Sequence, residues 1–372
     1  MVDQNASGKV QTVLGLIDPE SLGITLTHEH LLLDVAFLEP PRDRASDKGF
    51  YEKPVSLETI GPTKNYGIVN RQNFQLNDIP TAIDEVNLYK QYGGQSLVEA
   101  TSIGISRDPV GLARISRATG INVIMGASYY VHTAHPANMN SLSQKELSER
   151  IIKDLVEGVE DTTIKSGIIG EIGCSWPLED NERKVLKASA QAQLETGAPI
   201  LIHPGGNELA PLEILEVLNG AGANLERVIM GHLDRTIFNY EKFVELAKSG
   251  CYMEWDVFGK GGFSVLPKRP GQKYDSSVGV PNKIKPTDAM KLDTIHKLIV
   301  DGYGTKIVIS QDVDTRDRLE KYGGHGYSFI LRNIVPAMRS SDFTEQNIEA
   351  VSYTHLRAHE TRHDLVCRLL LE

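Results

Sequence analysis

Residues 24–30 read Ile-Thr-Leu-Thr-His-Glu-His, a short apolar run that ends in two histidines. Seven later runs share its short, β-branched and nearly continuous apolar character: residues 95–101, 122–128, 166–173, 198–204, 227–232, 251–256 and 306–312. Runs of this kind are typical of strands that are buried on both faces of a parallel sheet. The pattern therefore predicts eight parallel strands.

Helical patterns separate these runs, and several of them end in glycine, as a helix carboxyl terminus often does. They occupy residues 80–93, 108–120, 143–160, 178–197, 210–222, 239–250, 287–302 and 326–340. Eight strands that are each followed by a helical segment predict an α/β fold, the (β/α)8 TIM barrel. We expect residues 1–350 to form one such domain.

Two connections are longer than the others. Residues 31–79 follow the first predicted strand, and residues 258–286 follow the seventh. Both leave the carboxyl ends of strands, where barrel enzymes carry their active sites. Each is therefore predicted to be a long loop, and the basic second one is either a solvated segment or a cover for substrate.

The overall composition is that of a soluble globular protein, with 40% hydrophobic and 24% charged residues. The net charge of −10 argues against a nucleic-acid or anionic-membrane partner. There is no apolar signal-peptide core and no run of about 18 apolar residues. Three cysteines form no disulfide pattern. We expect a cytoplasmic protein with a small-molecule substrate, and a homodimer is left open.

Six potential metal ligands fall at the carboxyl ends of five predicted strands: His28, His30, Glu171, His203, His232 and Asp312. His28 and His30 are two residues apart, so both side chains point to one face of their strand. A single histidine at a strand end is usually a hydrogen-bonded core residue, but all six positions converge on one barrel mouth. Four histidines with two carboxylates suit a pair of divalent ions such as Zn²⁺.

The chain also resembles the phosphotriesterase family of the amidohydrolase superfamily, and within it the phosphotriesterase-related branch. The resemblance covers roughly residues 8–350. It is carried by the segments GKVQTVLGLI (8–17), TLTHEH (25–30), GISRD (104–108), GIIGEIGCSWPL (167–178), HLDRT (232–236) and KYGGHGYS (321–328).

The resemblance implies a division of the six ligands between two ions. The first ion would take His28, His30 and Asp312, the second would take His203 and His232, and Glu171 would bridge them. Bacterial phosphotriesterases bridge with a carboxylated lysine, whereas this chain has a glutamate. They also place a histidine after the seventh strand, where this chain has Val257, and this difference weakens any direct transfer of phosphotriesterase activity.

Two divalent ions would lower the pKa of bound water and make hydroxide available near neutral pH. The hydroxide would attack a carbonyl or phosphoryl group while Asp312 carries its proton to the leaving group, and Glu171 is the second residue expected to act in catalysis. Residues after the third, sixth and eighth strands are the substrate-binding candidates, namely Tyr129, Tyr130, Arg235 and His325.

Metal chemistry of this kind can hydrolyse amides, esters, lactones and phosphotriesters alike. The site therefore indicates the type of reaction but not the substrate. Animal members of the family hydrolyse N-acyl taurines, above all N-acetyltaurine, and the resemblance therefore implies an amidase. A lactonase or an aryl ester or phosphotriester hydrolase is the alternative. A barrel that binds metal or a partner without catalysis is a third reading.

Near the carboxyl end, residues 359–363 read His-Glu-Thr-Arg-His and match the H-E-x-x-H pattern of zinc proteases. A protease of this kind needs a third ligand further along, but Val366 and Leu369 stand where the extended motif has glycine and histidine. From about Val351 the sequence leaves the family pattern. We therefore expect residues 351–372 to be an atypical tail that is not native to the protein and has no catalytic role.

Overall fold

The computed structural model describes residues 8–39, 45–66, 68–260 and 285–352. Its centre is an eight-stranded sheet in the order β12-β11-β10-β9-β8-β7-β6-β3, in which neighbouring strands run parallel. The strands are β3 (Thr25–Glu29), β6 (Ser96–Glu99), β7 (Asn122–Ala127), β8 (Ile168–Gly173), β9 (Ile200–His203), β10 (Val228–Met230), β11 (Tyr252–Trp255) and β12 (Ile307–Ile309). Each lies within one of the eight predicted runs, so the strand prediction is confirmed.

Contacts just beyond the ends of β12 and β3 bring the two edge strands together. The Asp312 N–H donates to the His28 carbonyl at 3.2 Å, and the His28 N–H donates to Ser310 Oγ at 3.1 Å. The sheet is thus nearly closed as a barrel, and its last strand delivers Asp312 next to the histidines of its first.

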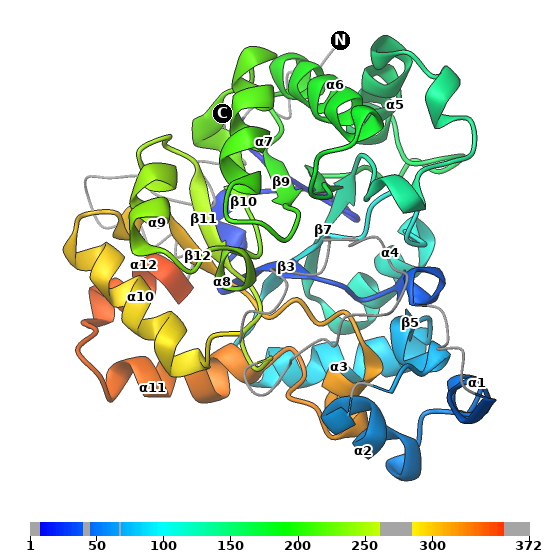
Figure 1. The fold of residues 1–372 in the computed structure, drawn as a ribbon, viewed down its shortest axis with the longest axis vertical. Helices are drawn as coiled ribbons and strands as arrows, with labels where there is room; N and C mark the ends of the chain where they lie inside the picture. The colour runs from blue at the N-terminus through cyan, green and yellow to red at the C-terminus, as the bar shows by residue number, and fades with distance from the viewer. Residues whose placement is uncertain (1–7, 40–44, 67, 261–284, 353–372) are drawn as a thin grey trace.

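Helices surround the sheet, as Figure 1 shows. They are α3 (Ile79–Gln91), α4 (Pro109–Thr119), α5 (Gln144–Val156), α6 (Asp180–Thr196), α7 (Ala210–Gly220), α9 (Tyr240–Ala247) and α10 (Asp288–Val300). The segment predicted at 326–340 begins as a π-helix, Ile330–Ile334, and continues as α11 (Val335–Arg339). The fold is therefore the predicted (β/α)8 barrel.

The barrel has two apolar layers. A large one lies mainly between the strands and the helices, and a smaller one joins one residue from most strands: Val98, Ile124, Ile168, Leu201, Ile229, Tyr252 and Val308. Val10 belongs to this smaller layer. It comes from an antiparallel hairpin of β1 (Val10–Thr12) and β2 (Gly15–Ile17), which the sequence analysis did not predict.

The connection at residues 31–79 contains secondary structure of its own. It includes α1 (Ala45–Tyr51) and α2 (Leu57–Tyr66), and a two-stranded antiparallel sheet of β4 (Leu33–Asp34) and β5 (Gln75–Leu76). Figure 1 shows α1 and α2 at the periphery, beyond α3 and β5. Most of the second long connection, residues 261–284, lies outside the described residues.

The last described helix is α12 (Glu345–Ser352), which buries Ile348 and Val351. The H-E-x-x-H motif at 359–363 and most of the predicted tail lie outside the described residues. Within the described part of the chain, none of the helices is long and apolar enough to cross a bilayer.

Candidate metal centre and active site

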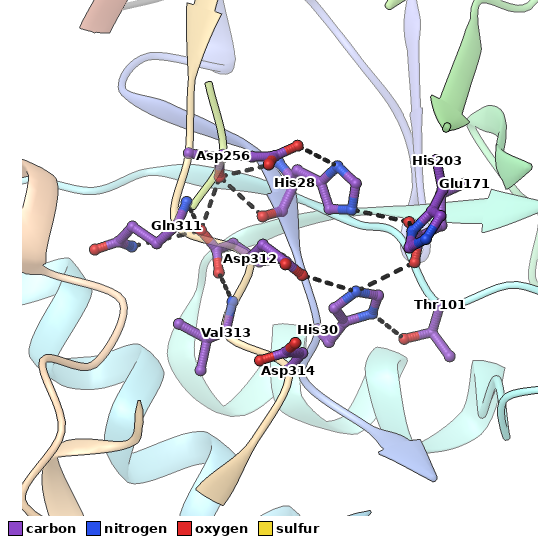
Figure 2. A network of polar contacts seen from close by, with 12 residues as sticks. His28, His30, Thr101, Glu171, His203, Asp256, Gln311, Asp312, Val313 and Asp314 are labelled. Carbon is purple, nitrogen blue, oxygen red and sulfur yellow. Dashed lines mark hydrogen bonds and ion pairs between the residues drawn. The ribbon is translucent and has the colours of Figure 1, made fainter. Parts of the chain in front are cut away.

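Two histidines from one strand begin the site. His28 and His30 lie at the end of β3, their ring centroids are 5.8 Å apart, and both are buried. Figure 2 shows both rings directed toward Glu171, with Asp312 beside His30. The intervening Glu29 points to the other side of the strand, as the alternation of a strand requires.

Glu171, at the end of β8, is the centre of the cluster. One of its oxygens, Oε2, lies 3.2 Å from His28 Nε2 and 2.9 Å from His203 Nδ1. The other, Oε1, lies 3.4 Å from His30 Nε2. His232 Nε2 is 3.4 Å from Oε2. One carboxylate thus contacts all four histidines, as a bridge between two ions would.

The donor set fits divalent ions. The side chains of His28, His30 and Asp312 offer ligand atoms that lie within 4.8 Å of one another, and a second group of this kind joins His28, Glu171 and His232. His28 Nε2 is buried, and its contact with Glu171 Oε2 at 3.2 Å does not have the geometry of a hydrogen bond. Histidine nitrogens combined with carboxylate oxygens are typical Zn²⁺ ligands.

His203 is placed to act through Nδ1. Its Nδ1 lies 2.8 Å from His232 Nε2 and 2.9 Å from Glu171 Oε2, so three potential ligand atoms converge at one point. Burial and the neighbouring His232 lower the pKa of His203 to about 4, which keeps its ring neutral at physiological pH. A neutral imidazole is the form that binds a metal.

Buried acceptors orient the other rings from behind. His28 Nδ1 lies 3.1 Å from Glu254 Oε2 and 3.2 Å from Asp256 Oδ2, and His232 Nδ1 lies 2.7 Å from Asp256 Oδ1. Such partners fix the tautomer and the orientation of a ligating histidine. Burial alone would raise the pKa of Asp256, but the adjacent His232 and His28 lower it overall.

His30 is oriented in a different way. Its Nδ1 lies 2.9 Å from the Thr101 hydroxyl, which donates to Glu99 Oε1 at 2.6 Å. Glu99 is fully buried, and burial raises its pKa to about 7. His30 therefore contacts the Glu99 carboxyl group indirectly, through the Thr101 hydroxyl.

Glu29 holds the segment that carries Asp312. It is fully buried, and its Oε1 and Oε2 each accept a backbone N–H at 2.9 Å, from Gln311 and Val313 respectively. Asp312 itself has φ +50°, a left-handed conformation that persists only when its surroundings impose it. This role was not predicted, because strand alternation shows that Glu29 faces away from the two histidines but not which residues it contacts there.

A cation completes the surroundings of Asp312. Lys260 Nζ, on the loop after β11, lies 2.7 Å from Asp312 Oδ2 and 3.0 Å from Asp314 Oδ2. Burial alone would raise the pKa of Asp312, but Lys260 and His30 lower it well below its usual range. The carboxyl group is therefore ionised, as a metal ligand or a proton acceptor must be.

The substrate-binding candidates divide into two groups. Tyr130 and Arg235 reach the cluster, with the Tyr130 hydroxyl 3.3 Å from His203 Nδ1 and Arg235 Nη2 3.2 Å from His203 Nε2. Tyr129 instead packs its ring edge-on against His135 at 6.2 Å. His325 lies against Phe329, with ring centroids 4.2 Å apart. The structure thus brings two of the four to the metal cluster.

Comparisons with known proteins agree with this geometry. Residues 8–355 match the phosphotriesterase family. The chain is 42% identical over 348 residues to an N-acetyltaurine hydrolase of Mus musculus, which covers 93% of this chain and 95% of the relative. It is 40% identical over 365 residues to an N-acetyltaurine hydrolase of Dictyostelium discoideum, covering 92% of this chain and 95% of the relative.

Solved structures share the fold. A resiniferatoxin-binding protein from Rhodobacter sphaeroides superimposes with a TM-score of 0.85 at 32% identity, covering 94% of this chain and 93% of that one. A lactonase from Listeria monocytogenes superimposes with a TM-score of 0.72 at 21% identity, covering 92% and 96%, and at that identity it bears on the fold alone. This chain belongs to the phosphotriesterase family, and it is an enzyme of the hydrolase class.

Proposed function

We propose that the protein is a binuclear metal-dependent amidase that hydrolyses N-acetyltaurine and related N-acyl taurines. The first ion is held by His28, His30 and Asp312, the second by His203 and His232, and Glu171 bridges them. The convergence of His28, His30, His203 and His232 on one carboxylate supports this assignment. Nitrogen and oxygen donors in this ratio favour zinc.

When bound, the ions supply Lewis acidity and lower the pKa of water to near neutrality. The chain's own residues then direct the reaction. Ionised Asp312 accepts a proton during attack and returns it to the departing amine nitrogen. Tyr130 and Arg235 lie beside His203, where they can donate hydrogen bonds to the substrate. Burial of the six ligands, each at most 6% exposed, keeps bulk water away from the reacting atoms.

One observation carries the choice of substrate. Relatives named N-acetyltaurine hydrolase are 39–42% identical to this chain across more than nine tenths of both sequences. That similarity covers the barrel strands and the loops that follow them. It therefore extends to the face on which all six proposed ligands lie.

The test is a direct assay on protein of known metal content. Zinc is measured by mass spectrometry, and the release of acetate and taurine from N-acetyltaurine is followed by NMR. We expect about two ions per chain, loss of activity on chelation and its recovery with Zn²⁺. The proposal fails if the fully loaded protein leaves N-acetyltaurine intact.

A substrate panel separates the alternatives. Lactones, aryl esters and phosphotriesters should be poor substrates, and Val257 in place of the family's histidine argues specifically against efficient phosphotriester hydrolysis. Preferred turnover of a lactone would replace the amidase by a lactonase. A loaded protein that turns over none of these compounds would point to a non-catalytic metal- or partner-binding barrel.

The location, domain extent and oligomeric state of the protein are proposals as well. We propose a cytoplasmic location, a single catalytic domain over residues 1–350 and an atypical tail over 351–372, with a homodimer left open. Chromatography with light scattering measures the oligomeric state. Sequencing of the transcript at its 3′ end decides whether the tail is native.

A further inference from the structure

Arg235 is an unusual neighbour for a metal centre. It lies in α8 (Leu233–Thr236), the short helix that starts directly after His232. Its side chain is 6% exposed, and Nη2 lies 3.2 Å from His203 Nε2. The other terminal nitrogen, Nη1, is buried without a hydrogen-bond partner among the described residues. A buried guanidinium nitrogen without an acceptor is costly, so this arrangement calls for a ligand.

The tautomer of His203 gives a second reason why Arg235 requires an acceptor. If Nδ1 binds the second ion, its lone pair is used and the ring proton must sit on Nε2. His203 Nε2 and Arg235 Nη2 are then two donors that face each other at 3.2 Å, and neither can accept. An anionic oxygen between them would accept from both. Metal binding at Nδ1 therefore removes the acceptor that His203 Nε2 otherwise offers to Arg235 Nη2.

Further positive charge lies close by. Lys260 approaches the cluster from the loop after β11, through its contacts with Asp312 and Asp314. Burial, together with the charges of Lys260 and Arg235, lowers the pKa of Lys285 to about 8. The three cations therefore act on the same region, at the edge of the metal centre.

We propose that Arg235, assisted by Lys260, binds the anionic group of the substrate, a sulfonate carried two carbons from the scissile amide nitrogen. A sulfonate has three acceptor oxygens, enough to accept from both terminal nitrogens of Arg235. This inference rests on the proposed function, because it assigns the selectivity of that same site. It also explains how the site can discriminate an N-acyl taurine from a neutral amide.

The decisive experiment compares two substrates that differ in charge alone as far as chemistry allows. N-acetyltaurine is paired with its neutral counterpart N-acetyl-2-(methylsulfonyl)ethylamine, and kcat/KM is measured for both. In Arg235→Met, which keeps an unbranched side chain but removes the charge and the donors, we expect the N-acetyltaurine value to fall about 10- to 100-fold, the range for charged hydrogen bonds. The value for the neutral sulfone should change little.

Controls isolate the charge at this position. Arg235→Lys should recover part of the loss. Arg339→Met removes an exposed arginine on α11 that pairs with Glu345, and it should leave both substrates unaffected. N-acetyl-β-alanine, with a carboxylate in place of the sulfonate, tests whether the subsite prefers three oxygens. Metal content is measured for each variant, and the ratio between substrates is read on the loaded fraction.

A binding measurement keeps this inference separate from the proposed function. Calorimetry with ethanesulfonate on the zinc-loaded wild type should show binding that Arg235→Met loses. This result would support the subsite even if N-acetyltaurine were not hydrolysed. Equal losses for the charged and neutral substrates in Arg235→Met, or wild-type protein that binds no ethanesulfonate, would overturn it.

Discussion

The two halves of the metal centre are built differently. On the β3 and β12 side, the ring nitrogen of His28 that faces away from the cluster contacts the carboxylates of Glu254 and Asp256. On the β9 side, the corresponding nitrogen of His203 faces the guanidinium of Arg235. Asp256 supports a histidine in each half, since it also lies 2.7 Å from His232 Nδ1, but in the second half His203 lies against a cation. Figure 2 shows the first half with Asp256 behind His28.

The difference separates two tasks. Carboxylates behind a ligating histidine raise its basicity and fix its orientation, which strengthens metal binding. A cation behind a histidine does the opposite, but it leaves positive charge available for a substrate. We therefore expect the ion held by His28, His30 and Asp312 to bind more tightly than the ion held by His203 and His232.

Removal of the bridging Glu171 carboxylate should abolish the difference in affinity between the two ions. In Glu171→Ala the carboxylate that contacts all four histidines is lost, so both ions should be depleted and activity should fall to the level of the chelated enzyme. Zinc content after dialysis and the rate with N-acetyltaurine measure this. Glu157→Ala, at the end of α5, is the surface control. Retention of one full ion per chain would show that the halves bind independently.

The next variant acts on the first half alone. Glu29→Gln keeps the size of the side chain but removes the charge that holds the backbone N–H groups of Gln311 and Val313. Asp312 should then be less well positioned, and affinity for the first ion should fall by about 10- to 100-fold, as for other supporting partners of metal ligands. Competition with a chromogenic chelator gives the two affinities separately.

The chain offers a matched control for this variant. Glu85 is also buried, and it accepts the backbone N–H groups of Glu320 and Lys321 at 2.9 and 2.8 Å, away from the metal cluster. Glu85→Gln should lower the thermal midpoint without changing either metal affinity. If both variants changed metal binding equally, Glu29 would have only a general structural role.

The contrast between the halves also shows what the sequence could and could not predict. The strands and the positions of the six proposed ligands follow from local apolar runs and from the residues that end them. The roles of Glu29 and Glu254 could not be read in this way, because they depend on which residues face each other across strands β3, β11 and β12. The β1–β2 hairpin escaped prediction because its strands are only three residues long.

The contacts of residues in loops were harder to predict from the sequence than those of residues in strands. Tyr129 and Tyr130 are neighbours in sequence, yet the Tyr130 hydroxyl contacts His203 whereas the Tyr129 ring packs against His135. Backbone direction after a strand decides this, and the local sequence does not encode it in a readable pattern. Arg235 was predicted as a candidate, but its buried Nη1 became apparent only in three dimensions.

The cations near His203 lead to a prediction about the pH dependence of the reaction. A lysine whose pKa is lowered to about 8 is charged below that pH and loses its charge above it. If Lys285 adds to the attraction for a sulfonate, kcat/KM for N-acetyltaurine should fall by about two- to fivefold as the pH rises through 8, the size of a weak charge pair. Burial is the largest cause of this lowered pKa, Lys260, Arg235 and Arg318 add to it, and Asp314 opposes it.

Two comparisons identify the group responsible for this decrease. Lys285→Met should remove the alkaline decrease for N-acetyltaurine and lower the value below pH 8. The neutral methyl sulfone should show no such decrease in either protein. A decrease shared by both substrates would assign the titration to the reaction chemistry and remove Lys285 from the comparison of the two halves.

A similarly small effect is expected from Tyr130→Phe. Its hydroxyl lies 3.3 Å from His203 Nδ1, the atom proposed to bind the second ion. Once that lone pair binds metal it cannot accept the phenol proton, so loss of the hydroxyl should leave metal affinity unchanged, in contrast to Glu29→Gln. The freed hydroxyl can donate to substrate, and a neutral hydrogen bond of about 1 kcal/mol corresponds to a roughly fivefold fall in kcat/KM. A loss of zinc in Tyr130→Phe would instead show that the hydroxyl supports His203 itself, and the second half would then be no less reinforced than the first.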